Sequence, residues 1–341
     1  MSTNQLIQNM VLAPEVPAAP GLVFRGFRGE ADYPAMLAVI SGSKEADQIE
    51  RTDSLEDVTR NYRHLVNCDP YQNMLFAEVD GRAIGYSRVW WEQEENGPRR
   101  YLQINFLLPE WRGNGIRRAM VRYCEQRLGE IASAQPANGP RVFEAWAADT
   151  ETHWESVLTE AGYEPVRYGL TMARPNLEEI PDLPLPDGLE VRPVRPEHYR
   201  QIWEAAHEAF RDHWGYTEDE WSEDNYRHWQ EDPLFQPHLF QVAWAGDQVA
   251  GMVQNFIDPK ENEAYHRRRG WTEGICVRRP WRRKGLARAL IARSFRVHKE
   301  QGMAEAALGC DAENLNGAVR LYTSMGFRPI KRFTTYRKPM A

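Results

Sequence analysis

The chain has 341 residues with a formal net charge of −7, and hydrophobic residues make up 42% of it. This length predicts about two domains, each long enough to bury its own core. No apolar run approaches the roughly 18 residues of a membrane span, and an acidic chain without a recognised nucleic-acid motif argues against a nucleic-acid partner.

The first 20 residues form a lead that is rich in Ala and Pro towards its end. The lead lacks the basic start and apolar core of a secretion signal, so we expect a flexible segment and a cytoplasmic protein. The four cysteines, Cys68, Cys124, Cys276 and Cys310, are far apart in the sequence and form no CxxC pair. Their spacing predicts buried thiols and no metal site.

Four segments recur in the same order in the two halves of the chain. The pairs, separated by 164 to 170 residues, are GLVFRGFR and GLEVRPVR, LFAEVDGRAIG and LFQVAWAGDQVAG, PEWRGNGIRRAMV and RPWRRKGLARALI, and AGYEPVRY and MGFRPIKR. Ordered matches at a fixed period indicate an internal repeat. We therefore predict two tandem domains, 21–174 and 188–341, joined by a Pro-rich linker at 175–187.

In each copy, the hydrophobic pattern mixes strands and helices around one sheet. For the second copy we expect a strand at 189–194, helices at 196–210 and 217–232, a strand pair at 239–257, a strand at 272–277, a helix from 286 that ends near Gly302, a strand at 304–311, a helix at 317–326 and a last strand from residue 327. Thr217, with Glu220 three residues later, fits the cap of the second helix.

The stretch VRRPWRRKGLARALIARSF, residues 277–295, gathers seven Arg and Lys side chains around Gly285. It joins a predicted strand to a predicted helix, and the first N–H groups of a helix have no partner inside the helix. Together with the helix dipole, these groups favour an anion. The alternative is a helix start whose charges face solvent.

These segments resemble the GNAT family, the Gcn5-related N-acetyltransferases. The family's phosphate-binding motif, Arg/Gln-x-x-Gly-x-Gly/Ala, matches Arg282 to Ala287, and its later motif is similar to NLNGAVRLYTSMGF at 314–327. The resemblance covers 188–341 well and 21–174 more loosely. It implies two tandem α/β (α+β) folds with mixed, mostly antiparallel sheets flanked by helices, as in two-domain enzymes such as mycothiol synthase.

The resemblance also implies acetyl-CoA as cofactor, with its pyrophosphate on the turn at 282–287 and a splayed strand pair beside the pantetheine arm. The cofactor-binding residues that it implies are Ile275, Cys276, Val277, Arg282, Arg283, Lys284, Gly285, Leu286, Ala287, Asn314 and Tyr322.

Acetyl transfer to an amine requires a neutral amine, donors for the developing oxyanion and a proton for the leaving thiolate. Glu273, in the strand at 272–277, is the candidate base, and the alternative is an exposed or salt-bridged strand residue. Tyr322 is the candidate acid, and the alternative is a core aromatic at helical spacing. The N–H of Val277 would polarise the acetyl carbonyl, as the resemblance implies.

The segment HEAFRDHWG, which follows the first helix of the second copy, contains acidic, His and Trp side chains suited to a cationic amine. Glu208, His213 and Trp214 are candidate acceptor contacts. Glu208, Asp212 and His213 are also alternative bases. The segment fits equally well as a capped helix end packed by aromatic rings.

The first copy departs from the pattern at the predicted chemical positions. Gln103, Arg117, Thr150 and Leu158 stand opposite Glu273, Ala287, Asn314 and Tyr322. Gln103 is not a base and Leu158 has no proton to give, so we predict an active second copy and a structural or acceptor-shaping first copy. A second CoA site remains open there, because its turn still contains Arg112, Gly113, Asn114 and Gly115.

These observations predict direct acetyl transfer from acetyl-CoA to a primary amine of a small molecule, in a ternary complex. The expected partner is that amine, with no nucleic acid or membrane, and the chain would act as a monomer or homodimer. The alternatives are a non-catalytic acyl-CoA-binding sensor and an acyltransferase that acts on a peptide or protein amine.

Overall fold

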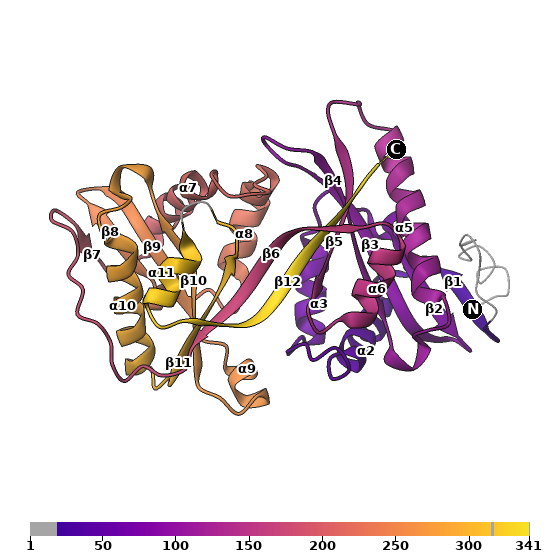
Figure 1. Ribbon diagram of the computed structural model, residues 1–341, viewed down its shortest axis with the longest axis horizontal. Helices are drawn as coiled ribbons and strands as arrows, with labels where there is room; N and C mark the ends of the chain where they lie inside the picture. Colours follow the sequence, from indigo (N-terminus) through magenta and orange to yellow (C-terminus); the bar gives the residue numbers. More distant parts are fainter. Residues whose placement is uncertain (1–18, 315–316, 341) are drawn as a thin grey trace. The chain divides into compact units, whose positions relative to one another are not determined.

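The computed structural model describes residues 19–314 and 317–340, so most of the predicted flexible lead lies outside the described residues. The chain divides into two compact units (Figure 1). The described part of unit 1 comprises residues 19–166 and 333–340, and that of unit 2 comprises the remaining residues between 167 and 332. Each unit is an α/β fold with a mixed, mostly antiparallel sheet, as the repeat predicts.

Unit 1 is built from the first copy and the end of the chain. Its elements are β1 (Leu22–Arg25), α2 (Tyr33–Ser43), α3 (Leu55–Arg63), α4 (Pro70–Asn73), β2 (Met74–Val79), β3 (Arg82–Gln93), β4 (Arg99–Leu107), α5 (Ile116–Ser133), β5 (Arg141–Ala148), α6 (Thr152–Glu160) and most of β12 (Arg328–Pro339). The sheet order is β1-β2-β3-β4-β5-β12, in which only β4 and β5 run parallel.

Unit 2 repeats this plan. Its elements are most of β6 (Glu164–Arg174), β7 (Glu190–Val191), α7 (Tyr199–Phe210), α8 (Glu223–Glu231), β8 (Gln241–Ala245), β9 (Gln248–Phe256), α9 (Pro259–Ala264), β10 (Arg269–Val277), α10 (Leu286–Glu300), β11 (Glu305–Asp311) and α11 (Ala318–Ser324). The sheet order is β6-β11-β10-β9-β8-β7, and β10 and β11 form its parallel pair.

The sheet of unit 2 separates two apolar cores. Side chains of β8 and β9 alternate between its faces, as expected for strands covered on both sides. Ala243 and Val253 pack with α10 and α11 on one face, whereas Val242 and Met252 pack with α7 on the other. The end of β10 lies between the two layers of helices.

The last strands of the two copies are exchanged between the units. β6, which ends the first copy, pairs with β11 over Gly169–Arg174, and β12, which ends the second copy, pairs with β5 over Phe333–Pro339. The compact units therefore differ from the sequence repeats by one strand each.

The Pro-rich segment that we predicted as a linker belongs to unit 2. Residues 175–188 contain no helix or strand. Leu177 is buried among α10 and α11 side chains, and Ile180, Leu183 and Leu185 pack against the same core. The chain has already entered unit 2 in β6, so this segment covers a core within that unit.

Three details of the second copy differ from the prediction or refine it. Its first strand is only two residues long. The predicted cap Thr217 is wrong, because α8 begins later, at Glu223, and Ser222 caps it by accepting a hydrogen bond from the N–H of Asn225 at 3.3 Å. Gly302 follows α10 with φ +79°, the left-handed conformation expected just after a helix.

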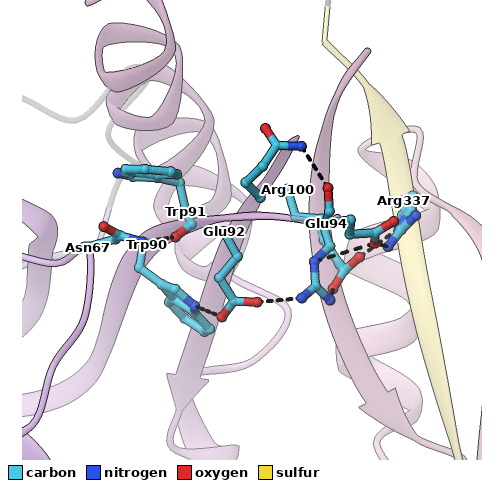
Figure 2. Close-up of polar contacts among 9 residues, drawn as sticks. Asn67, Trp90, Trp91, Glu92, Glu94, Arg100 and Arg337 are labelled. Carbon is cyan, nitrogen blue, oxygen red and sulfur yellow. Dashed lines mark hydrogen bonds and ion pairs between the residues drawn. The ribbon is translucent and has the colours of Figure 1, made fainter. Parts of the chain in front are cut away.

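A buried network of ion pairs holds β12 in unit 1 (Figure 2). The Nε of Arg337 donates to Glu144 at 2.6 Å, and the same guanidinium pairs with Glu94. Arg100 from β4 contacts the same two carboxylates and also Glu92. Burial raises the pKa of Glu144, and the two arginines oppose that rise.

No helix in the described part of the chain is long and apolar enough to cross a bilayer. All four cysteines are free, with Cys124 and Cys276 buried and Cys68 and Cys310 partly buried.

We predict that Arg337→Met lowers the free energy of unfolding by about 3–5 kcal/mol, because it leaves buried carboxylates with one fewer cation. Urea unfolding followed by circular dichroism measures the change. Lys338→Met is the matched control, because Lys338 pairs with the more exposed Glu125 at 2.9 Å, and such pairs contribute about 1 kcal/mol or less.

The loss should be larger at pH 8 than at pH 5. Burial already raises the folded pKa of Glu144, and loss of Arg337 raises it further in the variant. The variant therefore regains stability as the pH falls and the buried carboxyl takes up a proton. Equal losses for Arg337→Met at the two pH values would contradict this account of the network.

Candidate active site

A bulge interrupts β10 one residue after the predicted base. The register against β9 shifts between Glu273 and Cys276, and Gly274 has φ +56°. A Cβ at position 274 would lie 3.0 Å from the side chain of Gln254. Both the backbone conformation and the space therefore require glycine, and the extra residue bends the end of β10 away from a regular ladder.

The parallel strands β10 and β11 separate beyond their first three pairs. Arg269–Trp271 pairs with Glu305–Ala307, and the ladder ends there. The last residues of β10, Thr272–Val277, thus leave their former neighbour and form one edge of an opening in the sheet. This is the splayed strand pair that the sequence resemblance implies.

The basic turn ends in an open helix N-terminus. Gly285 caps α10 with φ +86°, and no side chain caps the helix. A Cβ at position 285 would meet nothing within 4 Å, so the main chain faces open space. Arg283 also has a positive φ, 61°, a conformation that costs a non-glycine residue about 1 kcal/mol.

A cavity of about 710 Å³ connects the end of β10, this turn and α11. It brings together all of the predicted cofactor-binding residues except Lys284, and it also includes His213. Residues that the sequence did not single out complete the lining, namely Ala209, Trp281, Arg288, Ala318, Arg320 and Leu321.

The side chain of Arg282 is turned towards the protein. Its Nε donates to the carbonyl of Val277 at 2.9 Å, and its Nη1 pairs with Asp212 at 2.7 Å. Arg279 pairs with Asp212 as well, and Arg278 pairs with Glu208 at 2.6 Å. Three arginines of the basic run therefore hold the turn against the end of α7 by ion pairs.

These ion pairs weigh against two alternatives for the base. The arginines at 279 and 282 lower the pKa of Asp212 to about 2, so its carboxylate is too weak a base near neutral pH. Glu208 is held by Arg278. In contrast, no described residue forms an ion pair or a side-chain hydrogen bond with Arg283 or Arg288, and both line the cavity.

His213 and Trp214 lie at one side of the site. His213 lines the cavity, and burial lowers its pKa, which keeps the ring neutral at pH 7. Trp214 is 39% exposed, and the guanidinium of Arg167 lies 5.3 Å from its ring centroid. Trp214 is not among the residues that line the cavity, so its role as an acceptor contact stays a prediction.

The carboxylate of Glu273 has the properties of a base that works near neutral pH. Burial raises its pKa to about 7, and the N–H of Gly309 opposes the rise through a 2.6 Å hydrogen bond. Burial also raises the pKa of Tyr322, so its hydroxyl keeps its proton. The thiols of Cys276 and Cys310, with pKa values raised by burial to about 12 and about 11, are not nucleophiles at neutral pH.

In unit 1 the corresponding space is filled. The register between β3 and β4 is continuous, without a bulge. Arg117, opposite Ala287, is buried, and its guanidinium lies 4.3 Å from the ring centroid of Trp154. Trp154 itself stands opposite Ala318 when the last motifs are aligned. Two alanines that line the cavity in unit 2 are thus replaced in unit 1 by a packed cation–π pair.

The other first-copy positions are also enclosed. Gln103 is 1% exposed and donates to the Tyr163 hydroxyl at 2.6 Å, and Leu158 is fully buried. Arg112 makes the same contacts as Arg282: it pairs with Asp47 through two bonds, of 2.8 and 2.7 Å, and donates to the carbonyl of Leu107. In both copies, the arginine of the turn therefore holds the turn in place through a carboxylate and a backbone carbonyl.

Sequence reasoning missed the bulge at Gly274 and the role of Trp154. A glycine inside a strand pattern is a signal for a bulge. The Trp154–Ala318 difference is visible only once the repeats are aligned beyond the motif. Among the described residues, no cluster of His, Cys, Asp and Glu could hold a metal ion.

Comparison with known proteins identifies the same family in both copies. A family model described as "Acetyltransferase (GNAT) family" matches residues 39–135 and 203–327. A mycothiol acetyltransferase of Salinispora arenicola is 26% identical over 310 residues, which cover 90% of this chain and 94% of the relative. The mycothiol acetyltransferase of Geodermatophilus obscurus is 26% identical over 259 residues, 75% of this chain and 79% of the relative.

Solved structures show the same arrangement. A GCN5-related N-acetyltransferase from Sphaerobacter thermophilus matches with a TM-score of 0.69 and 26% identity, covering 96% of this chain and 97% of its own. A tandem GNAT protein from the clavulanic acid biosynthesis pathway matches in fold, with a TM-score of 0.63 at 13% identity over 93% of this chain and 98% of its own.

The backbone of the turn yields a prediction about stability. We expect Arg283→Gly to raise the free energy of unfolding by about 0.5–1 kcal/mol, because relief of the left-handed conformation exceeds the entropy that glycine adds to the unfolded chain. Lys284→Gly, at an ordinary φ, is the control and should lower it. Thermal unfolding distinguishes the two. A lower midpoint for Arg283→Gly would show that the turn is not strained there.

Proposed function

The chain belongs to the acetyltransferase (GNAT) family, and from this premise we propose that unit 2 transfers the acetyl group of acetyl-CoA to a primary amine of a small molecule. Members of this family use acyl-CoA donors. The observation that supports the proposal most directly is the cavity of unit 2, which is lined by an open helix N-terminus and by the end of a bulged strand, two residues beyond a carboxylate of raised pKa.

The cavity fits the donor by its chemistry. Coenzyme A contains a pyrophosphate, and the main-chain N–H groups at the start of α10 are suited to bind it. Arg283 and Arg288 supply positive charge that no ion pair with a described residue neutralises, and the side chain of Arg282 shapes the turn. The apolar side of the cavity, with Ile275, Leu286 and Leu321, suits the uncharged pantetheine arm.

Each chemical requirement has a candidate group. The thioester supplies the activated acetyl group. Glu273 accepts a proton from the attacking amine, directly or through one water. The N–H of Val277 polarises the acetyl carbonyl, and Tyr322 supplies a proton to the departing thiolate. Glu273 acts on Tyr322 electrostatically, and the charge contributes to the raised pKa of that phenol.

The acceptor is proposed to enter beside His213 and Trp214. The relatives named mycothiol acetyltransferase support a small-molecule acceptor, at 26% identity. A neutral His213 and an accessible Trp214 ring suit a substrate that is bound mainly by apolar and hydrogen-bonding contacts.

The two copies would divide the work. In unit 1, Arg117 and Trp154 fill the place that corresponds to the donor cavity, and neither Gln103 nor Leu158 can transfer a proton. We therefore propose that unit 1 binds no CoA and that its turn at Arg112–Gly115 is a structural remnant.

Matched substitutions test this division. Gly285 and Gly115 have similar left-handed conformations, with φ +86° and +74°, so a Leu at either position should strain its turn to a similar extent. We expect Gly285→Leu to weaken CoA binding about 100-fold, the loss of two hydrogen bonds to a charged group. Gly115→Leu should leave CoA binding unchanged in calorimetry. Equal losses would contradict the division.

The pH dependence of turnover tests the base. Because the carboxylate must be ionised, kcat/KM should fall as the pH drops below the Glu273 pKa of about 7. Glu273→Gln should reduce kcat/KM by about 100-fold or more and remove the contribution of this carboxylate to the acidic limb, so that the remaining fall follows protonation of the acceptor amine alone. The measurement is acetyl-CoA consumption against a panel of small amines from pH 5.5 to 9. An unchanged profile in Glu273→Gln would exclude Glu273 as the base.

A further inference from the structure

The separation of β10 and β11 leaves one main-chain donor without a strand partner. Gly309 lies in β11 two residues beyond the last pair with β10, while its other side faces Thr171 in β6. Its N–H points to the β10 side, where the Glu273 carboxylate accepts it at 2.6 Å. A side chain thus spans the gap that the backbone ladder no longer closes.

We propose that Gly309 is a positioning residue: its N–H fixes the carboxylate of Glu273 in the opening between β10 and β11, and its small size leaves that carboxylate a place that a branched side chain would occupy. For catalysis this inference rests on the proposed function, but the contact itself can be tested without turnover.

The carboxylate of Glu273 limits the size of the side chain at position 309. Gly309 does not have a positive φ, so the backbone does not require glycine. A glycine inside a strand weakens it unless something approaches closely. Here the approaching group is Glu273, because a Cβ at position 309 would lie 3.4 Å from one carboxylate oxygen and 3.9 Å from the other. A methyl fits within contact distance, whereas a branched side chain would displace the carboxylate.

The first copy changes both members of the pair. Gln103 replaces Glu273, and Ala145 stands at the position of Gly309 in the aligned last motifs. The Gln103 amide instead donates to the Tyr163 hydroxyl. The carboxylate and the glycine that accommodates it therefore occur together in the copy with the open cavity, and both are absent from the copy whose cavity is filled.

The charges around Glu273 make this hydrogen bond important. The titratable groups that interact with its carboxylate are Tyr322 of α11 and Cys310 of β11. Both keep their protons at neutral pH, so neither offers a compensating charge. Across the ladder, β9 places the neutral Gln254 opposite Glu273. The Gly309 N–H is the contact that favours the ionised form against the effect of burial.

A direct test follows the Gly309 amide proton by NMR in the full-length protein labelled with ¹⁵N-glycine. In the wild type this resonance should titrate with the carboxylate, near pH 7. In Glu273→Gln the titration should vanish. In Glu273→Asp, whose side chain is one methylene shorter and cannot reach the N–H, the amide should also stop responding. A Gly309 amide that does not titrate in the wild type, or that still titrates in Glu273→Asp, overturns the inference.

A second measurement perturbs the other partner. With ¹³C-labelled Glu, the midpoint for Glu273 should rise by roughly one pH unit in Gly309→Val, because a hydrogen bond to the charged form is lost, and by less in Gly309→Ala. Thr171→Val, directly across from Gly309 in β6, is the control and should leave the midpoint unchanged. A Gly309→Val midpoint equal to that of the wild type overturns the inference.

The outcome is separable from that of the proposed function. If the NMR shifts appear but turnover survives in Glu273→Gln, the contact is real and Glu273 is not the base. If turnover requires Glu273 but the Gly309 amide never titrates, the function stands and the positioning role is wrong.

Discussion

The constraint on which the rest of the structure depends is the exchange of the last strand between the copies. The sheet of unit 2 ends in β6, whose Met172 is fully buried in the core beside α10 and α11. The sheet of unit 1 in turn includes β12, held by Tyr336 in its core and by Arg337 in the network of Figure 2. Because each core contains a strand from the other copy, neither copy can be lost without opening the other's core. This gives a physical reason for the chain to keep both copies. The first copy also supplies Arg167, which pairs with Asp311 at the end of β11 at 2.7 Å and lies over Trp214.

The two units share this fold, and the volume of the side chains at matching positions decides which of them has a cavity. The turn before the long helix is fastened in the same way in both units, by Arg112 with Asp47 and by Arg282 with Asp212. The difference arises just beyond the turn. Alanine at 287 and 318 leaves space in unit 2, whereas Arg117 and Trp154 pack against each other in unit 1. Such a pair compensates for the loss of water around a buried guanidinium, and the pKa of Arg117 is lowered to about 9, mainly by that burial. Larger side chains thus fill in unit 1 the positions that two alanines occupy in unit 2.

The sequence predicts the elements that carry this site better than the orientation of the side chains within it. The repeat, the turn at Gly285 and the strand that carries Glu273 follow from motif and periodicity, because these signals are local. The orientation of Arg282 does not follow from the sequence. An arginine in a phosphate-binding motif suggests contact with phosphate, and only the structure shows that it reaches Asp212 and the Val277 carbonyl.

The strand exchange cannot be predicted from the sequence either, because β6 and β12 have the same pattern whichever sheet they join. Thr217 illustrates a smaller failure: a capping sequence matches, but the next serine that can cap, Ser222, begins the helix.

The opening between β10 and β11 accounts for both the space beside the end of β10 and the raised pKa of Glu273. When two parallel strands separate, the space between them becomes available to a ligand, and main-chain groups that faced each other lose their partners. A carboxylate placed at this point is removed from water by the surrounding sheet and helices, which favours its neutral form. It also meets an unpaired N–H, which favours its charged form. The two effects oppose each other, and for Glu273 they leave the pKa at about 7. A regular ladder would satisfy the Gly309 N–H with a backbone carbonyl, so the irregularity of the sheet gives the Glu273 carboxylate its hydrogen-bond donor.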